Sequence, residues 1–223
     1  MKRKLICLSL SAFLAASGAM PAFAATSAVS FQDLQGNWAE EAALYCAEKG
    51  LMQGYNGNFR PADHLSRAEM AAVIVRSLGL TEETDLTAYS DIDASSWYYS
   101  DMSKAVAAGI FQGSGDKLNP GADITREEAF TVFARAYQLE ADLSVLERFR
   151  DSDQISAWAR DSVSAMVRKG WIEGSDGALK PKSPISRGEL AQIFYNGGND
   201  MTPSSGENPS SEVTIYREST PEH

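Results

Sequence analysis

Apolar residues recur along the chain with helical spacing, and the pattern appears three times. After each of three tryptophans, the residues one, five, eight and nine positions farther on are apolar in every copy. After each of three arginines, the residues three, four and seven positions farther on are apolar. Both spacings place apolar side chains on one face of an α-helix. The pattern therefore predicts three copies of a unit that contains two amphipathic helices.

The copies also keep a fixed spacing between their recurring residues, because each Trp lies 29 residues before its Arg. The pairs are Trp38 with Arg67, Trp97 with Arg126, and Trp158 with Arg187. Between them recur the glycines Gly54, Gly113 and Gly174. Self-similarity of this kind indicates tandem repeats. We place repeat 1 at residues 31–78, repeat 2 at 89–137 and repeat 3 at 149–196, and we expect a flexible polar tail over 197–223.

Capping residues set the expected helix bounds in repeat 1. Asn37 and Glu40 stand in capping-box position, so we expect a first helix over about 38–49. The second helix is expected over about 66–78, with Gly79 behind it. One unit of about fifty residues buries too little surface to be stable alone. We therefore predict a mainly α domain in which three helix-loop-helix repeats share one core around a pseudo-threefold axis.

The N-terminus carries the three parts of a secretory signal peptide. A basic start at 2–4 is followed by an apolar run over 5–16 and a small-x-small site at 22–24. The run is short for a membrane anchor, so we expect residues 1–24 to be cleaved and the mature chain to be secreted without a membrane span. Cys46 is then the only cysteine, which predicts no internal disulfide and a buried thiol.

Charge and composition exclude several classes of function. The formal net charge of −10 argues against general binding of nucleic acid or of an anionic membrane surface. After the signal peptide the histidines are His64 and His223, and neither stands in a catalytic or metal-binding pattern. We therefore expect no enzymatic activity, no metal and no cofactor. An anionic ligand would have to be held by a few well-placed cations.

A Ser/Thr-Arg-x-Glu motif opens each second helix. Its outer residues form capping boxes, which are Ser66 with Glu69, Thr125 with Glu128, and Ser186 with Glu189. The Arg opposes the helix dipole, so capping does not explain it. Two interpretations stay open: an anion site for a carboxylate or phosphate, or a salt bridge to a neighbouring repeat. The recurring Trp likewise suits either sugar stacking or a core anchor between repeats, and we favour the core anchor.

Together these residues resemble the surface-layer homology (S-layer homology, SLH) domain family. The match is fullest in repeat 1, where it comprises Phe31, Asp33, Trp38, Ala39, Gly50, Gly54, Tyr55, Gly57, Phe59, Pro61, Ser66, Arg67, Ala68 and Glu69. The resemblance covers residues 31–196. It implies a three-pronged helical domain at the bacterial cell surface, in the S-layer.

The resemblance also implies a function. Such domains anchor proteins noncovalently to the cell wall by binding a secondary cell wall polysaccharide attached to peptidoglycan, often a pyruvylated one, in grooves between repeats. The implied recognition residue is the motif Arg in each repeat, with the Trp and Gly-loop residues lining the grooves. Glu127, which follows Arg126, is expected to weaken an anionic ligand there. The alternative is a structural envelope protein that assembles with other envelope proteins without binding glycan.

Overall fold

The computed structural model describes residues 29–201, so the expected signal peptide at 1–24 lies outside the described residues. Within 29–201 the regular elements are helices, and other backbone pairing is limited to isolated bridges. The α-helices are α1 (Glu40–Glu48), α2 (Arg67–Leu78), α3 (Tyr99–Ala107), α4 (Arg126–Ala136), α5 (Arg160–Arg168) and α6 (Arg187–Gly197). Short 3₁₀ helices are η1 (Leu143–Arg148), η2 (Ser152–Gln154), η3 (Ala157–Ala159) and η4 (Gly198–Met201). No helix of this part of the chain combines the length and apolarity needed to cross a membrane.

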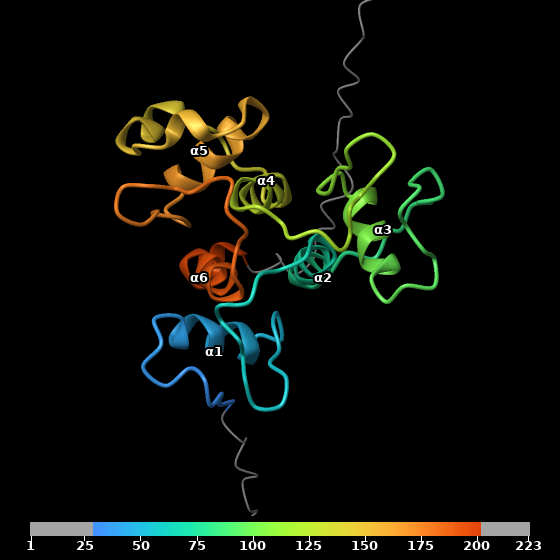
Figure 1. The fold of residues 1–223 in the computed structure, drawn as a ribbon, viewed down its shortest axis with the longest axis horizontal. Coiled ribbons are helices and arrows are strands. Elements are labelled where there is room, and N and C mark those ends of the chain that lie inside the picture. The colour runs from blue at the N-terminus through green and yellow to red at the C-terminus, as the bar shows by residue number, and fades with distance from the viewer. Residues whose placement is uncertain (1–28, 202–223) are drawn as a thin grey trace, which may run out of the picture.

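The second helices of the repeats form the centre of the molecule. Figure 1 shows α2, α4 and α6 side by side, with α1, α3 and α5 arranged around them. Each outer helix packs mainly against the inner helix of the preceding repeat, α3 against α2 and α5 against α4. The three repeats form a closed ring, because α1 of the first repeat packs against α6 of the third. Each of the three prongs therefore joins helices from two different repeats, and the predicted mainly α fold is confirmed.

Backbone hydrogen bonds join the three repeats in a closed ring just before the inner helices. The N–H of Leu65 donates to the C=O of Ile185 at 3.2 Å, that of Ile185 to Ile124 at 3.0 Å, and that of Ile124 back to Leu65 at 2.9 Å. All three side chains are buried in the core. A ring of three equivalent bonds is the connectivity expected of pseudo-threefold packing.

Each inner helix begins with the capping box that the Ser/Thr-x-x-Glu pattern predicts. The Ser66 hydroxyl accepts from the N–H of Glu69, whose carboxylate accepts in turn from the N–H of Ser66 at 2.8 Å. The boxes of α4 and α6 are complete in the same way. At the other end of α2, Gly79 takes the left-handed conformation, with φ 64°. Local signals therefore suffice to define this helix.

The outer helices begin later than the sequence pattern predicts. α1 starts at Glu40, and no side chain caps it. The Asn37 carboxamide accepts from the N–H of Ala39 at 3.0 Å, while the Glu40 carboxylate accepts from the N–H of Gly36 at 3.1 Å. The two side chains stabilise the turn before the helix instead of forming a capping box, so that expectation is wrong. Trp38 consequently lies in this turn and not on the helix.

Cys46 lies buried on α1, as its place in the apolar pattern predicts. Its Sγ is 3.7 Å from the carbonyl oxygen of Ala191 in α6, and burial raises the pKa of the thiol to about 12. Because the thiolate is the reactive form, we expect iodoacetamide to leave Cys46 unmodified in the folded protein at mildly alkaline pH. Mass spectrometry should find rapid modification once denaturant is added. Rapid modification without denaturant would show instead that α1 readily separates from α6.

The end of the described chain is helical where a flexible tail is expected. Gly197 is the last residue of α6, and η4 follows it. Met201 is buried, and its carbonyl oxygen accepts a hydrogen bond from the Tyr137 hydroxyl at 3.4 Å. The expected start of the tail at 197 is therefore wrong, because η4 packs onto the core. The rest of the 197–223 segment lies outside the described residues.

Candidate functional site

An aspartate near the start of each repeat holds the Gly-rich hairpin of the same repeat. The three hairpins are closed by bridges between Tyr55 and Asn58, between Ser114 and Lys117, and between Ser175 and Ala178. The buried Asp151 carboxylate accepts from the N–H of Leu179 at 2.9 Å and from that of Lys180 at 2.7 Å. Lys180 has a φ of 50°, a left-handed conformation that needs such support. Asp33 and Asp91 make the matching pairs of bonds in repeats 1 and 2. Their recurrence after an aromatic residue is the only sequence signal for this role.

The recurring glycines of the hairpins are packing positions. A Cβ at Gly113 would lie 2.4 Å from the carbonyl oxygen of Lys117, and one at Gly174 would lie 2.6 Å from that of Ala178. A Cβ at Gly54 would likewise lie too close to the backbone across its hairpin. Any side chain would collide with the backbone on the other side of the hairpin. The fold alone explains these glycines, and their contact with a ligand stays a prediction.

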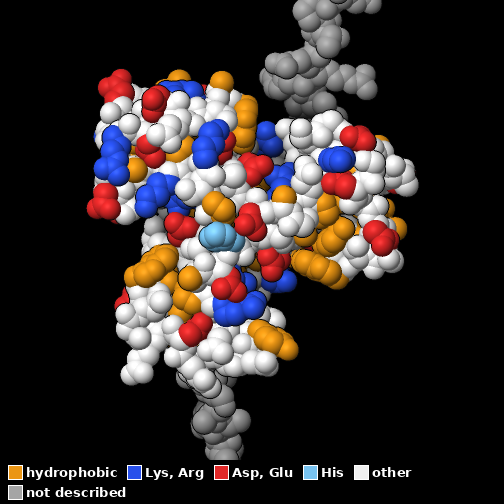
Figure 2. Space-filling model, in the orientation of Figure 1, with side chains coloured by type: hydrophobic (Ala, Val, Ile, Leu, Met, Phe, Trp, Pro, Cys, Tyr) orange, Lys and Arg blue, Asp and Glu red, His pale blue; other side chains and the backbone are white. Residues whose placement is uncertain are grey.

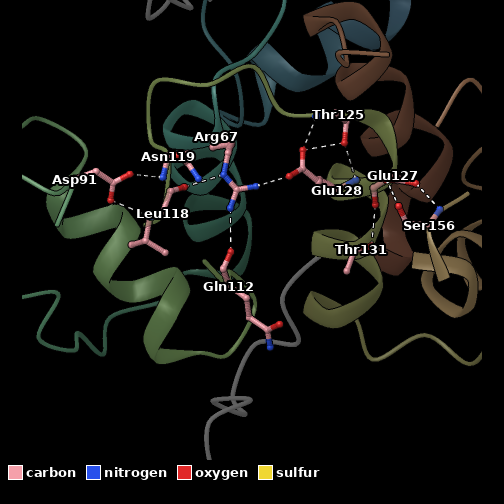
Figure 3. Close-up of polar contacts among 10 residues, drawn as sticks. All are labelled: Arg67, Asp91, Gln112, Leu118, Asn119, Thr125, Glu127, Glu128, Thr131 and Ser156. Atoms are coloured by element: carbon pink, nitrogen blue, oxygen red, sulfur yellow. Dashed lines mark hydrogen bonds and ion pairs between the residues drawn. The ribbon is translucent and has the colours of Figure 1, made fainter. Parts of the chain in front are cut away.

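Arg67 reaches from the first turn of α2 into the hairpin of repeat 2 (Figure 3). Its Nε donates to the carbonyl oxygen of Leu118 at 2.8 Å, and its Nη2 to that of Gln112 at 2.9 Å. Its Nη1 pairs with Glu128 at 2.9 Å, and the guanidinium lies 5.2 Å from the ring centre of Phe111. The side chain is only 11% exposed. Of the two interpretations left open, the salt bridge to a neighbouring repeat is the one that Arg67 makes, and its contact with an anion stays a prediction.

The other two motif arginines make equivalent contacts with the hairpin of the next repeat in the ring. Arg126 donates from Nε to the carbonyl oxygen of Leu179 at 2.7 Å, and its Nη1 pairs with Glu189 at 2.6 Å. Arg187 donates from Nε to the carbonyl oxygen of Phe59 at 2.9 Å. Burial lowers the pKa of Arg126 and Arg187, and the Glu189 charge opposes this shift for Arg126. Both stay cationic at neutral pH, so Arg126, like Arg67, forms the salt bridge between repeats.

The three recurring tryptophans face solvent. Trp38 is 63% exposed, Trp97 66% and Trp158 57%. The favoured interpretation of core anchors is therefore wrong. Each Trp stands in a turn or 3₁₀ segment before an outer helix, where the apolar stripe of the helix does not include it. Trp171, which lies outside the repeated pattern, is the buried one.

Two grooves each combine elements of all three repeats. The Arg67 groove, of about 520 Å³, is lined by Arg67 of repeat 1, by the hairpin and α4 of repeat 2, and by Trp158 of repeat 3. The Arg126 groove, of about 500 Å³, is lined by Arg126 of repeat 2, by the hairpin and α6 of repeat 3, and by Trp38 of repeat 1. Both volumes suit a small ligand. Trp97 lines neither of them.

Several polar residues of the grooves carry no signal in the repeated motif. They are Thr131 and Arg135 in the Arg67 groove, and Lys180, Gln192 and Asn196 in the Arg126 groove. None of these positions carries the same residue in all three repeats, so the repeat pattern does not reveal them. The spacing of four between Thr131 and Arg135, which places both on one face of α4, is the one available hint.

Glu127 lines neither groove, although it follows Arg126 directly. Its buried carboxylate accepts from the N–H and hydroxyl of Ser156 at 3.0 and 2.9 Å (Figure 3). The same carboxylate pairs with Lys182 at 2.5 Å. Ser156 lies two residues before Trp158, so Glu127 fixes the segment that presents this Trp. Lys182 balances the charge of Glu127, and the expectation that Glu127 weakens an anionic ligand beside Arg126 stays a prediction.

Comparison with models of known families gives three matches to the S-layer homology domain, at residues 30–71, 88–130 and 148–191. The matches cover more than half of the chain and coincide with the three repeats. The chain belongs to the S-layer homology domain family. The resemblance drawn from the motifs is thus confirmed.

The chain of this SLH protein is similar to parts of much longer proteins. It is 34% identical to the Surface-layer 125 kDa protein of Lysinibacillus sphaericus, over 86% of this chain and 17% of that protein. It is 25% identical to the S-layer protein sap of Bacillus anthracis, over 86% of this chain and 24% of that protein. It is 31% identical to the Exoglucanase XynX of Acetivibrio thermocellus, over 75% of this chain and 16% of that protein. The chain spans less than a quarter of the length of each of these relatives.

Family and relatives together indicate a secreted cell-surface module of the S-layer type, and they support a role in cell-wall anchoring. The match to an exoglucanase covers too little of that enzyme to carry its activity to this chain. Within residues 29–201, no group of His, Cys, Asp and Glu side chains is arranged to hold a metal ion.

Proposed function

We propose that the SLH module anchors noncovalently to the bacterial cell wall by binding an anionic, pyruvylated polysaccharide in the grooves between its repeats. The observation that carries this proposal is that each groove sets an exposed Trp beside cationic and amide side chains. A sugar ring offers apolar C–H faces to an aromatic ring and hydroxyl edges to polar groups. A pyruvyl ketal adds a carboxylate, for which a guanidinium is the matching partner.

Long-range electrostatics do not favour this ligand, because the formal net charge of the chain is −10. Figure 2 shows acidic and basic side chains interspersed over the face in view, with no broad basic area. An anionic polymer is therefore repelled at a distance and must be held by local contacts. Such binding depends on the groove residues and selects for the ligand that fits them.

The test uses purified cell walls before and after extraction of the polymer that is not peptidoglycan. We expect the full chain to sediment with intact walls and to remain in solution with extracted walls. Equal retention on both preparations would contradict the polysaccharide as the ligand.

A substitution at Trp158 tests the groove itself. Trp158→Ala removes an exposed aromatic face and should weaken retention on intact walls roughly three- to tenfold, while thermal unfolding stays unchanged. Tyr195→Ala is the control, since Tyr195 is exposed but lines neither groove. Sedimentation over a series of wall concentrations measures both variants. Equal weakening by the two would show that the effect does not arise in the groove.

The alternative function is a structural envelope protein whose motif arginines serve as salt bridges between repeats. The ion pairs of Arg67 with Glu128 and of Arg126 with Glu189 favour it in part. This alternative predicts that the chain self-associates in solution and that its retention on walls does not change when the polymer is extracted. A monomer that binds an acidic sugar excludes it.

A further inference from the structure

One cation in the Arg67 groove has no hydrogen-bond or ion-pair partner among the residues that the structure describes. Arg67 is paired with Glu128, and the Asp123 carboxylate lies 3.4 Å from Nδ1 of His64. The contact with Glu128 is an ion pair, whereas the contact of Asp123 is one only when His64 is protonated. Together the two contacts involve three of the four charged side chains that line the groove. The fourth is Arg135, whose guanidinium makes no hydrogen bond or ion pair with any residue between 29 and 201.

We infer that Arg135, and not the motif Arg67, binds the carboxylate of an acidic sugar in the Arg67 groove. This inference rests on the proposed function. It names the residue that makes the Arg67 groove selective for an anionic ligand. Arg135 is in the last turn of α4, one turn beyond Thr131, and shares the groove with Trp158. The groove thus offers an aromatic face and a guanidinium to one ligand.

The surroundings of Arg135 favour an anion. Its side chain is exposed, yet nearby protein removes enough water to lower its pKa, and no carboxylate opposes that shift. The group stays charged at neutral pH. A partly desolvated cation without a counter-ion gains more from a carboxylate ligand than a fully solvated one does.

Arg67 is poorly placed for the same task. Its Nε, Nη1 and Nη2 already bond Leu118, Glu128 and Gln112. An anion that took over these donors would release the hairpin and leave Glu128 without its cation. Arg67 therefore shapes the groove and holds its wall.

The Arg126 groove differs at the corresponding positions. There Arg126 is paired with Glu189, and the remaining charged residues are Lys180 and Glu173, which have opposite signs. Asn196 stands where Arg135 stands in the other groove, and its amide donates to the carbonyl oxygen of Trp171 at 3.1 Å. The Arg126 groove thus offers an anion a lysine ammonium, with a carboxylate in the same groove, in place of the Arg135 guanidinium, and the two grooves are not equivalent.

The experiment is calorimetric titration of the full chain with a disaccharide that bears a pyruvyl ketal, and with the neutral methyl ester of the same disaccharide. Arg135→Asn places in repeat 2 the residue that repeat 3 carries at the same position. We expect it to weaken binding of the acid about tenfold and to leave binding of the ester within about twofold of the original chain. Arg135→Lys should keep most of the affinity for the acid, because it keeps the charge.

Arg76→Asn is the matched control, since Arg76 is the counterpart of Arg135 in repeat 1 but donates to the carbonyl oxygen of Leu51 at 2.6 Å. It should leave the affinity for the acid unchanged. The inference is overturned if Arg135→Asn binds the acid as tightly as the original chain does. It is also overturned if the substitution lowers the affinity for the acid and for the ester by the same factor. If the original chain is retained equally on intact and extracted walls, the proposed function itself is overturned. If its retention depends on the polymer but Arg135→Asn binds the acid unchanged, this inference alone is overturned.

Discussion

Arg67→Ala is expected to lower the free energy of unfolding by about 2–4 kcal/mol. The substitution removes the donors for the carbonyl groups of Leu118 and Gln112 and leaves Glu128 without its cation. Denaturant unfolding followed by circular dichroism measures the change. Arg135→Ala is the control, expected within about 0.5 kcal/mol of the original chain because that side chain makes no hydrogen bond or ion pair with the described residues.

The comparison separates a structural Arg from a recognition residue. If Arg67→Ala unfolds like the original chain but is no longer retained on cell walls, the structural role is contradicted and Arg67 becomes a ligand contact. Arg67→Lys is a useful companion variant. It keeps the positive charge but cannot reproduce the planar set of three bonds, so it should also be destabilised.

A chain reduced to residues 25–137, which holds repeats 1 and 2, is expected to show no cooperative unfolding transition. Removal of repeat 3 uncovers the faces of α1 and α4 that pack on α6 and α5. It also takes Ile185 out of the backbone ring. Too little apolar surface then remains buried to offset the conformational entropy of the chain.

The control for this truncation is a chain of residues 25–201, which keeps all three repeats and should unfold as the full chain does. Circular dichroism during heating measures both. A sharp transition in the 25–137 fragment would show that two repeats already form a folded unit. The fragment also lacks Trp158 and α6, so we expect it to lose retention on cell walls.

The sequence predicts the inner helices well because their signals are local. The capping box of Ser66 and Glu69 and the left-handed Gly79 bound α2 within its own residues. The Trp positions are less well predicted. Their spacing is compatible with a helix start at Trp38, but the bonds of Asn37 and Glu40 delay α1 by two residues and leave Trp38 in solvent.

The partners of the motif arginines could not be predicted, because they come from other repeats. Those of Arg67 lie 45 to 61 residues farther along the chain. No local pattern shows that Glu128, which already caps its own helix through one oxygen, pairs with Arg67 through the other. Arg135 could not be predicted for a different reason: repeat 3 carries Asn196 at the corresponding position, so the charge is not shared by all three repeats.

The contact of α1 with α6 also sets the number of repeats. In an open stack of repeats, the first and last copies each leave one face uncovered and need special polar caps. Here every repeat has two neighbours, so there is no terminal copy to cap. A fourth copy could join the ring in the same way only by separating α1 from α6.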